Sequence, residues 1–510
     1  MPPRNCRLPC LRMAVVVVVA CLTYDLGGVR ADQELEEQRS NLLFVFADQM
    51  RASAMGFLGE EPVVTPNLDR LAEEAVVFTE AASNYPVCSP YRAMLLTGQY
   101  PHRNGVISNC LSRTAPYGVE LKTDARCWSD VLKASGYCLG YVGKWHLEAP
   151  YEPYIDCANN RGDVAWNEWT PPKRRHGFDY WHAYNTYDFH LRPLYWDTGA
   201  GRDEFHYVDK WGPAHEADLA VEFIRDKQGR FRDSEKPFAL VVSMNPPHTP
   251  YQMHPEKYLE PYAAMTDEQL SARPNVPPAG TRWGDHYRQN ICHYYAMITG
   301  VDEQFGRIID ALDDAGLAEN TIVVFTSDHG NCLGIHGHGT KNVPEEESMR
   351  IPLLIRFPAK LRPRREDLLI SVPDLYPTLL DLMGLGEEIP PAVEGTSHAQ
   401  LLVSGRGKRP ASQLYLWVPC EEPASGRRGV RTERHTLVID RMPGQEENII
   451  LYDNVADPYQ LKNVAEDQPE VVGRLIREEL TPWLRRTGDP WLGADAERTP
   501  PADVAGKKKQ

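Results

Sequence analysis

Continuous apolar runs recur along this chain, and stretches with helical periodicity separate them. The first run, Asn41–Ala47, is apolar at every position after Asn41, which suits a strand buried on both faces. A helix is expected to begin at Thr65-Pro66, and a long amphipathic helix is expected from about Asp285 to Leu317. Further buried strands are predicted at Tyr137–Val142, Phe238–Ser243, Thr321–Thr326 and Ile351–Phe357. This alternation predicts an α/β domain, placed at residues 40–395, with a mainly parallel sheet sandwiched by helices.

Two regions depart from this alternation. Residues 148–215 are rich in Trp, Tyr, Arg and His with little periodicity, and are interpreted as an insertion on the active-site side of the domain. Toward the C-terminus, short segments at Gln413–Val418 and His435–Asp440 indicate a small sheet, and a helix is expected near Pro469–Leu484. The sequence therefore predicts a smaller C-terminal α+β domain over residues 396–493, followed by a disordered tail at 494–510 that ends in three lysines.

The first 31 residues have the pattern of an export signal. A basic start precedes the apolar run Met13–Leu22, which is too short to span a bilayer. Val29-Arg30-Ala31 fits signal-peptide cleavage, whereas Val18-Val19-Ala20-Cys21 fits a lipoprotein box that would anchor the protein through Cys21. Either pattern predicts an exported protein, periplasmic or extracellular, and the choice between free and lipid-anchored stays open.

Composition narrows the classes of partner and cofactor. The chain has 55 Lys and Arg against 71 Asp and Glu, a net charge of −16, so nucleic acid is excluded as a partner through bulk charge. An anionic substrate would need a local cluster of cations. Eleven cysteines occur, but no Cys-x-x-Cys or Cys/His pair has the spacing of a structural zinc site. The sequence does not determine disulfide pairing or oligomeric state.

Polar side chains follow four of the predicted strands. In an open α/β sheet, ligands bind outside the carboxyl ends of the strands, so these side chains are expected to meet. Two acids, three histidines, a glutamine and a lysine are delivered to this edge; the segments are Asp48-Gln49, Gly143-Lys144-Trp145-His146, Asn245-Pro-Pro-His248 and Ser327-Asp328-His329-Gly330. The set combines metal-binding carboxylates with cations for an anion, and lacks a Gly-x-Ser-x-Gly nucleophile and a phosphate-binding P-loop.

Cys88 supplies a candidate nucleophile. Pro90 suits the first turn of a helix, which would place Cys88 at the positive end with backbone N–H groups facing an anion. Arg92 can reach the same site. Taken alone, this arrangement predicts a low-pKa thiol beside a cation; an inert buried cysteine is the alternative.

At this point the residues resemble the sulfatase family of the alkaline-phosphatase-like superfamily. The stretch from Cys88-Ser-Pro-Tyr-Arg92 to Gly105 is similar to the family signature, whose core is Cys-x-Pro-x-Arg, although Tyr91 replaces the usual small residue. Further similar segments, spread from Asn41 to Pro358 in the family's order, are Ala47-Asp48-Gln49, Gly143–Leu147, Pro247–Pro250 and Asp328–Ser348. The resemblance implies an alkaline-phosphatase-like fold and hydrolysis of sulfate esters.

The resemblance also implies that Cys88 is oxidised after translation to Cα-formylglycine, by a formylglycine-generating or an anaerobic sulfatase-maturing enzyme. A serine that attacked a sulfate ester would remain sulfated. A hydrated aldehyde carries two hydroxyls on one carbon, so one can attack sulfur and the other can expel sulfate as the carbonyl re-forms.

The remaining roles are carried over from the family position by position. One divalent cation is implied, with ligands Asp48, Gln49, Cys88, Asp328 and His329. Oxygen ligands favour Ca²⁺, and the nitrogen ligand leaves Mn²⁺ or Mg²⁺ open. Arg92 would hold the hydrated aldehyde, and Lys144 and Lys341 would clamp the sulfate oxygens. His146 resembles the base for sulfate release and His248 the acid or hydrogen-bond donor at the leaving oxygen, whereas His336 is interpreted as structural.

Three functions remain in competition. The first is hydrolysis of an aryl or carbohydrate sulfate monoester; the second is hydrolysis of a phosphonate monoester or phosphodiester; the third is a catalytically disarmed secreted binding protein. Six side chains of the insertion are expected either to line the approach to the site and bind a saccharide or merely to pack the insertion: Trp166, Trp169, Trp181, His182, Trp196 and Arg202.

Overall fold

The computed structural model describes residues 39–226 and 228–492. The predicted export signal at 1–31, with the alternative anchor Cys21, and the predicted tail at 494–510 lie outside the described residues. Within the described ranges, no helix is both long enough and apolar enough to cross a membrane. All eight cysteines of this part are free thiols.

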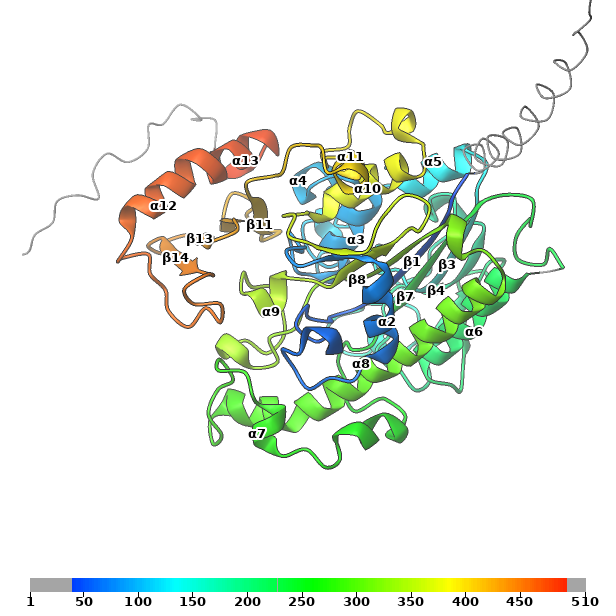
Figure 1. Cartoon of the computed structure of the whole chain (residues 1–510), viewed down its shortest axis with the longest axis horizontal. Coiled ribbons are helices and arrows are strands. Elements are labelled where there is room, and N and C mark those ends of the chain that lie inside the picture. Colours follow the sequence, from blue (N-terminus) through cyan, green and yellow to red (C-terminus); the bar gives the residue numbers. More distant parts are fainter. Residues whose placement is uncertain (1–38, 227, 493–510) are drawn as a thin grey trace, which may run out of the picture. The chain divides into compact units, whose positions relative to one another are not determined.

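A ten-stranded sheet runs through the molecule, and its five central strands are parallel (Figure 1). The strand β1 (Asn41–Ala47) lies between β8 (Thr321–Ser327) and β7 (Phe238–Met244). Beyond β7 lie β3 (Cys138–Lys144) and β4 (Tyr180–Tyr184). Four of these strands coincide with predicted apolar runs, and the predicted α/β class with a mainly parallel sheet is confirmed.

Short strands complete both edges of this sheet. On the β8 side the order is β9 (Leu353–Arg356), β2 (Val76–Phe78) and β10 (Arg364–Glu366), with β9 antiparallel to both of its neighbours. On the β4 side, β5 (Leu194–Asp197) and β6 (His206–Tyr207) are antiparallel. The region interpreted as an irregular insertion, 148–215, therefore extends the sheet by three strands.

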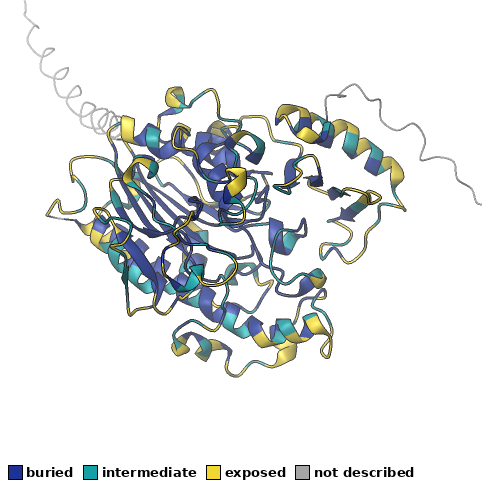
Figure 2. Cartoon of the chain, turned by 180° about the vertical axis from the view of Figure 1, so that it is seen from behind, coloured by how far each residue is buried: buried dark blue, intermediate teal, exposed yellow. Residues whose placement is uncertain are grey.

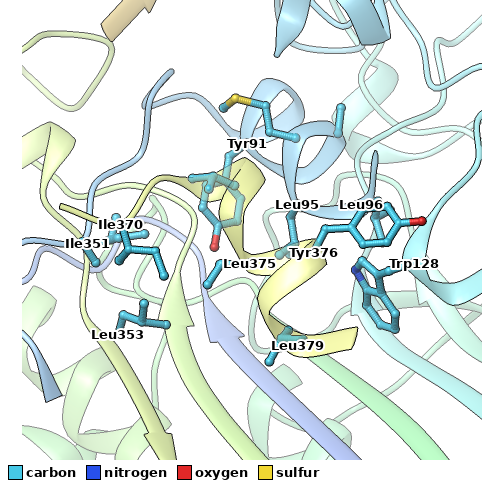
Figure 3. Packing of buried hydrophobic residues seen from close by; sticks show 14 of the residues in the cluster. Tyr91, Leu95, Leu96, Trp128, Ile351, Leu353, Ile370, Leu375, Tyr376 and Leu379 are labelled. Carbon is cyan, nitrogen blue, oxygen red and sulfur yellow. The ribbon is translucent and has the colours of Figure 1, made fainter. Parts of the chain in front are cut away.

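Helices cover both faces of the sheet, so successive side chains of β1 are buried on opposite faces. Leu42, Phe44 and Phe46 face one apolar cluster, whereas Leu43 and Val45 face the other. The first cluster contains α3 (Cys88–Thr97), α5 (Trp128–Ala134) and α10 (Val372–Leu382), as Figure 3 shows for their packed side chains. The second contains α2 (Pro66–Glu74), α6 (Gly212–Arg225) and α8 (Arg282–Asp314). In Figure 2 the strands between these layers are buried.

The C-terminal part forms a second, antiparallel sheet. Its strands are β11 (Gln413–Trp417), β12 (Gly426–Arg431), β13 (His435–Arg441) and β14 (Asn448–Asp453). The single helix predicted near Pro469–Leu484 is α12 (Pro469–Leu475), a π-helical turn at Ile476–Leu480 and α13 (Thr481–Arg486). The smaller α+β unit of the predicted fold is thus present, and the boundaries at 395 and 396 stay predictions. The shorter helices are α4 (Pro101–Asn104), α7 (Asp267–Leu270), α9 (Glu346–Met349) and α11 (Ala399–Ser404).

A buried ion pair fastens the segment after β1 to helix α8. Arg51 Nη2 lies 2.6 Å from Glu61 Oε2, and both side chains are fully buried. Tyr295 of α8 donates to the same carboxylate oxygen at 2.8 Å, and Tyr294 accepts from the Arg51 amide at 3.0 Å. The segment that carries Asp48 and Gln49 is therefore held against the helix layer by charge and hydrogen bonds.

Replacing Glu61 by Ala is expected to lower the free energy of unfolding by about 3–5 kcal/mol, because Arg51 would stay charged and buried without its partner. The matched control is Asp310→Ala, which breaks the exposed Arg70–Asp310 pair (N···O 2.8 Å) and should cost below about 1 kcal/mol. Chemical denaturation of both variants measures the free energy of unfolding. An equal loss in the two variants would contradict the proposed importance of burial.

Candidate active site

The carboxyl ends of four neighbouring strands bring the predicted site residues together. Ala47, the last residue of β1, lies opposite Met244 of β7 and Ser327 of β8. The residues that follow these strands, Asp48, Asn245 and Asp328, therefore emerge at one edge of the sheet. The last residue of β3, Lys144, ends at the same edge, since Gly143 lies opposite Ser243 of β7.

Cys88 is the first residue of α3 and lies at the centre of these side chains. Its Sγ atom is 3.1 Å from Lys341 Nζ, 3.4 Å from His329 Nε2 and 3.6 Å from Asp48 Oδ1. Burial and the Asp48 charge raise the pKa of the thiol to about 11 despite the nearby lysines. The prediction of a low-pKa thiol is therefore wrong, because sequence shows the cations but not the depth of burial or the adjacent carboxylate.

Asp48 pairs with two cations in this pocket. Its Oδ2 atom lies 2.7 Å from Lys144 Nζ and 3.1 Å from Arg92 Nη2, and all three side chains are buried. Burial alone would raise the pKa of Asp48, but Lys144, His248 and Lys341 together hold it well below its usual value. Arg92 also donates to the Lys144 carbonyl at 2.6 Å, which orients its guanidinium toward the site.

The donor set beside Cys88 fits a divalent cation. One atom each of Asp48, Cys88, Asp328 and His329 lies within 4.8 Å of the other three, and all four residues are buried. His329 Nδ1 is 2.9 Å from the Gly330 carbonyl, so Nδ1 carries the hydrogen and Nε2 presents a lone pair to the carboxylates. Burial and the Asp48 charge raise the pKa of Asp328. A divalent cation would offset the negative charge of the two buried carboxylates and would also bind the nitrogen lone pair that faces them.

Gln49 and Lys341 lie at the rim of this donor set. Gln49 has a positive φ of 72°, which turns its side chain into the pocket, where its Oε1 accepts from Lys341 Nζ at 3.2 Å. Its backbone N–H donates to Asp328 Oδ1 at 3.0 Å. The structure thus brings Gln49 to the site, and its role as a metal ligand stays a prediction.

The His146 side chain is buried, and its imidazole ring is available to a substrate. Both ring nitrogens lack a hydrogen-bond partner within the described residues, and the backbone has a positive φ of 54°. Burial, together with the charges of Lys144 and Arg92, holds the pKa of His146 well below its usual value. The imidazole is therefore neutral at neutral pH and can accept a proton, as a general base must.

His248 is oriented in part by Asp188, a residue that the sequence analysis did not name. Its Nδ1 lies 2.9 Å from the Thr249 carbonyl and 3.3 Å from Asp188 Oδ1, which leaves Nε2 for a substrate. Asn245 donates to Asp188 at 3.2 Å and accepts from Lys144 Nζ at 3.0 Å. The position of Asn245 directly after β7 was a usable signal; Asp188 lies inside the insertion, where no pattern indicated it.

The insertion contributes less to the approach than its composition suggested. Trp181 and Trp196 are fully buried, so the expectation that they bind a saccharide is wrong: they fill the core. Trp169 donates to the Ala200 carbonyl at 3.1 Å and Arg202 pairs with Glu168 at 2.8 Å, both within the insertion. Trp166 alone of this set has its ring beside an active-site residue, 6.2 Å from the His146 ring.

His336, which was interpreted as structural, contacts a glutamate and not the sulfur of Cys88. Its Nε2 atom lies 3.0 Å from Glu347 Oε2, and this carboxylate raises the pKa of His336 although burial opposes the shift. Glu347 in turn pairs with Arg273 at 2.5 Å. The three residues brace the segment that carries Lys341.

Comparison with known proteins agrees with this geometry. Residues 40–385 match the family described as Sulfatase, and residues 334–485 match the one described as N-sulphoglucosamine sulphohydrolase, C-terminal. The chain therefore belongs to the sulfatase family. An endo-4-O-sulfatase of Bacteroides thetaiotaomicron is 40% identical, over 91% of this chain and 96% of its own length. A ulvan-active sulfatase of Formosa agariphila is 33% identical, over 95% and 88%.

Solved structures support the same family. A sulfatase-family protein of Bacteroides fragilis is 51% identical, with a TM-score of 0.86 over 89% of this chain and 97% of its own. A phosphonate monoester hydrolase of Agrobacterium radiobacter, 23% identical with a TM-score of 0.64 over 88% and 96%, shares the fold alone. The named relatives of high identity act on sulfate esters, and this chain is a sulfuric ester hydrolase.

The pH dependence of kcat/KM tests the assignment of His248. Burial and the charges of Lys144 and Lys341 lower the pKa of His248 below its usual 6.5. If His248 must carry a proton to protonate the leaving oxygen, kcat/KM falls as pH rises through this lowered pKa, and the optimum lies on the acidic side of 6.5. His248→Gln should remove this descending limb. An unchanged limb in the variant would refute the assignment.

Proposed function

We propose that this chain hydrolyses sulfate monoesters of a carbohydrate through a formylglycine made from Cys88. The observation that carries the proposal is the setting of Cys88 Sγ, at the positive end of α3 and 3.1 Å from Lys341 Nζ, in a pocket that also holds Lys144 and Arg92. A buried thiol with a raised pKa is a poor nucleophile. The cations are therefore better suited to bind an anionic sulfate ester that is attacked by another group, the hydrated aldehyde.

Formylglycine at position 88 and a divalent cation would each supply part of the chemistry. The hydrated aldehyde supplies two hydroxyls on one carbon, one to take the sulfuryl group from the ester and one whose deprotonation releases sulfate. A divalent cation held by Asp48, Asp328 and His329, with Gln49 and the modified Cys88, supplies positive charge at the sulfate oxygens. Calcium suits the oxygen ligands, with Mg²⁺ or Mn²⁺ as alternatives.

The residues of the chain divide the remaining work. Lys144 Nζ and Lys341 Nζ lie 4.0 Å and 3.1 Å from Cys88 Sγ, where they can bind sulfate oxygens. Arg92 neutralises the carboxylates behind them. Neutral His146 accepts the proton that sulfate release requires, and His248 Nε2 donates to the leaving oxygen while Asp188 steadies its ring. Water replaces the alcohol overall, giving alcohol, sulfate and a proton.

A carbohydrate substrate is supported by the rim of the site and by the relatives. Phe189 is 43% exposed and packs on Tyr187 with ring centroids 5.4 Å apart. Both neighbours of Phe189 contact His248, Asp188 through its carboxylate and His190 through the His248 carbonyl at 2.8 Å, so an exposed aromatic residue lies on the segment that orients the acid. The curated relatives named above act, by their names, on 4-O-sulfate groups and on ulvan.

Maturation and location belong to the same proposal. Formation of the aldehyde needs a formylglycine-generating or an anaerobic sulfatase-maturing enzyme as a partner. The export signal predicted at residues 1–31 would carry the chain out of the cytoplasm, either free or lipid-anchored at Cys21.

Tryptic mass spectrometry of the peptide that contains Cys88 tests the proposed nucleophile. Protein made with a maturing enzyme should carry an aldehyde or its hydrate at Cys88 and release sulfate from a sulfated oligosaccharide. Cys88→Ala should lose more than about 10³-fold in kcat/KM, and the control Cys292→Ala should keep full activity. Modified protein that prefers an aryl phosphonate tenfold over every sulfate ester would favour the second function, and protein with no modification at all would favour a binding protein.

Lys341→Ala should reduce kcat/KM by about 10²–10³ because a partly buried cation aimed at developing charge is lost. Lys360→Ala is the control, since the Lys360 ammonium group contacts the Leu382 carbonyl and the Phe357 ring, and Phe357 follows β9 at the opposite edge of the sheet from the site. Steady-state sulfate release measures both variants. A loss of less than threefold in Lys341→Ala would remove this lysine from the proposed clamp.

A further inference from the structure

The strands of the insertion place three metal-ligating side chains on one face of the sheet. His182 of β4 lies directly opposite Asp197 of β5. His206 of β6 lies opposite Tyr195 of β5, which is two residues from Asp197. Because side chains alternate along a strand, residues opposite each other and residues two apart share a face. His182, Asp197 and His206 therefore form one cluster.

The first turn of α6 adds a fourth member. His215 Nε2 lies 3.0 Å from His182 Nε2, and its ring packs on Tyr195 with centroids 5.3 Å apart. Two imidazole nitrogens at this distance are placed either for a hydrogen bond between them or for a shared metal ion. The helix thus closes over the face that carries the other three residues.

The distances within the cluster suit a small cation. One donor atom each of His182, Asp197 and His206 lies within 4.8 Å of the others. Asp197 Oδ1 is 2.6 Å from His182 Nδ1, and Asp197 Oδ2 is 3.7 Å from His206 Nδ1. The Asp197 carboxylate thus lies between Nδ1 of His182 and Nδ1 of His206, where the three groups can bind one ion, and His215 contacts the other nitrogen of His182 as an outer partner.

The cluster is accessible, and its charge state is suitable. The side chains of Asp197 and His206 are 61% and 42% exposed, so an ion can enter and the two ligands can adjust. Burial lowers the pKa of His182, and burial with the neighbouring His182 lowers the pKa of His215 to about 4. The hydrogen bond from His182 lowers the pKa of Asp197. At neutral pH His182 and His215 are therefore neutral imidazoles and Asp197 is an ionised carboxylate, forms compatible with metal binding.

We propose that His182, Asp197, His206 and His215 form a binding site for a divalent transition metal of the zinc class, distinct from the active site. Two imidazoles and one carboxylate form a ligand set that zinc takes in proteins, with His215 as the outer partner that orients His182, whereas calcium and magnesium prefer oxygen alone. The spacing of cysteines and histidines gave no sign of this site, because its ligands come from three strands and the residue that orients His182 comes from a helix.

The place of the cluster in the fold gives it a role. β4 and β5 form a hairpin whose connecting segment, 185–193, carries Asp188 and His190. These two residues contact His248, and Asp188 also contacts Asn245. An ion that joins His182, Asp197 and His206 to α6 would brace this hairpin from outside the pocket. The four residues are positioning residues and touch no reacting atom.

Zinc binding to calcium-loaded, full-length protein tests the proposal. Wild-type protein is expected to retain about one zinc per chain more than His206→Gln after dialysis, measured by elemental analysis. His206→Gln and His215→Gln should each weaken zinc binding at least about tenfold. Zinc should raise the unfolding temperature of wild type by a few degrees and leave that of His206→Gln nearly unchanged.

His254→Gln is the matched control, because His254 Nε2 also lies 2.9 Å from a histidine nitrogen, Nδ1 of His293, but no carboxylate, thiol or third imidazole of the described residues completes a three-ligand set with that pair. This variant should bind zinc as wild type does. Cobalt supplied in place of zinc should give visible absorption in wild type and the control and lose it in the cluster variants. Equal zinc content and equal thermal response in wild type and His206→Gln would overturn the proposal, whatever the sulfatase activity.

Discussion

The Asp48 carboxylate joins the elements of the active site through its two oxygens. One oxygen lies 2.7 Å from Lys144 and 3.1 Å from Arg92, and the other lies 3.6 Å from Cys88 Sγ. The partners come from β3 and α3, whereas Asp48 follows β1. An unpaired charge at this depth would cost several kcal/mol, so each ion needs the others in place. The site is assembled only when the sheet and the helix that carries Cys88 are both in register.

Close approach of two strands makes this pairing geometrically feasible. Gly143 has a φ of +99°, and a Cβ atom there would lie 2.2 Å from the Ser243 carbonyl oxygen of β7. Only glycine combines this conformation with such contact. Lys144 follows directly, with its carbonyl accepting from Arg92 and its ammonium directed to Asp48. A side chain at position 143 would push β3 from β7 and move the lysine away from the sulfur.

The sequence predicted the parts of this molecule that depend on local pattern. The apolar runs indicated β1, β3, β7 and β8, since strands buried on both faces need such runs, and the polar residues after them indicated the site. The strands β4 to β6 were not predicted, because the insertion is rich in aromatic residues, and the sequence alone does not distinguish aromatic residues that fill a core from those that line a binding surface. Trp181 and Trp196 fill the core. Asp188 was not predicted as a site residue, because its role depends on contacts with His248 and Asn245, which are distant from it in the chain.

Burial has opposite effects on the thiol and on the cations around it. Removing water disfavours the thiolate and raises the pKa of Cys88 to about 11, although Lys341 and Lys144 lie beside it. The same low dielectric strengthens the attraction of these cations for an anion that enters the pocket. The formal charges of Asp48 and Asp328 are outnumbered by those of Arg92, Lys144 and Lys341, so the pocket is positive in a chain whose net charge is −16. A pocket of this kind gains from a nucleophile that needs no ionisation before it meets the ester, and a carbon that carries two neutral hydroxyls meets that requirement where a buried thiol does not.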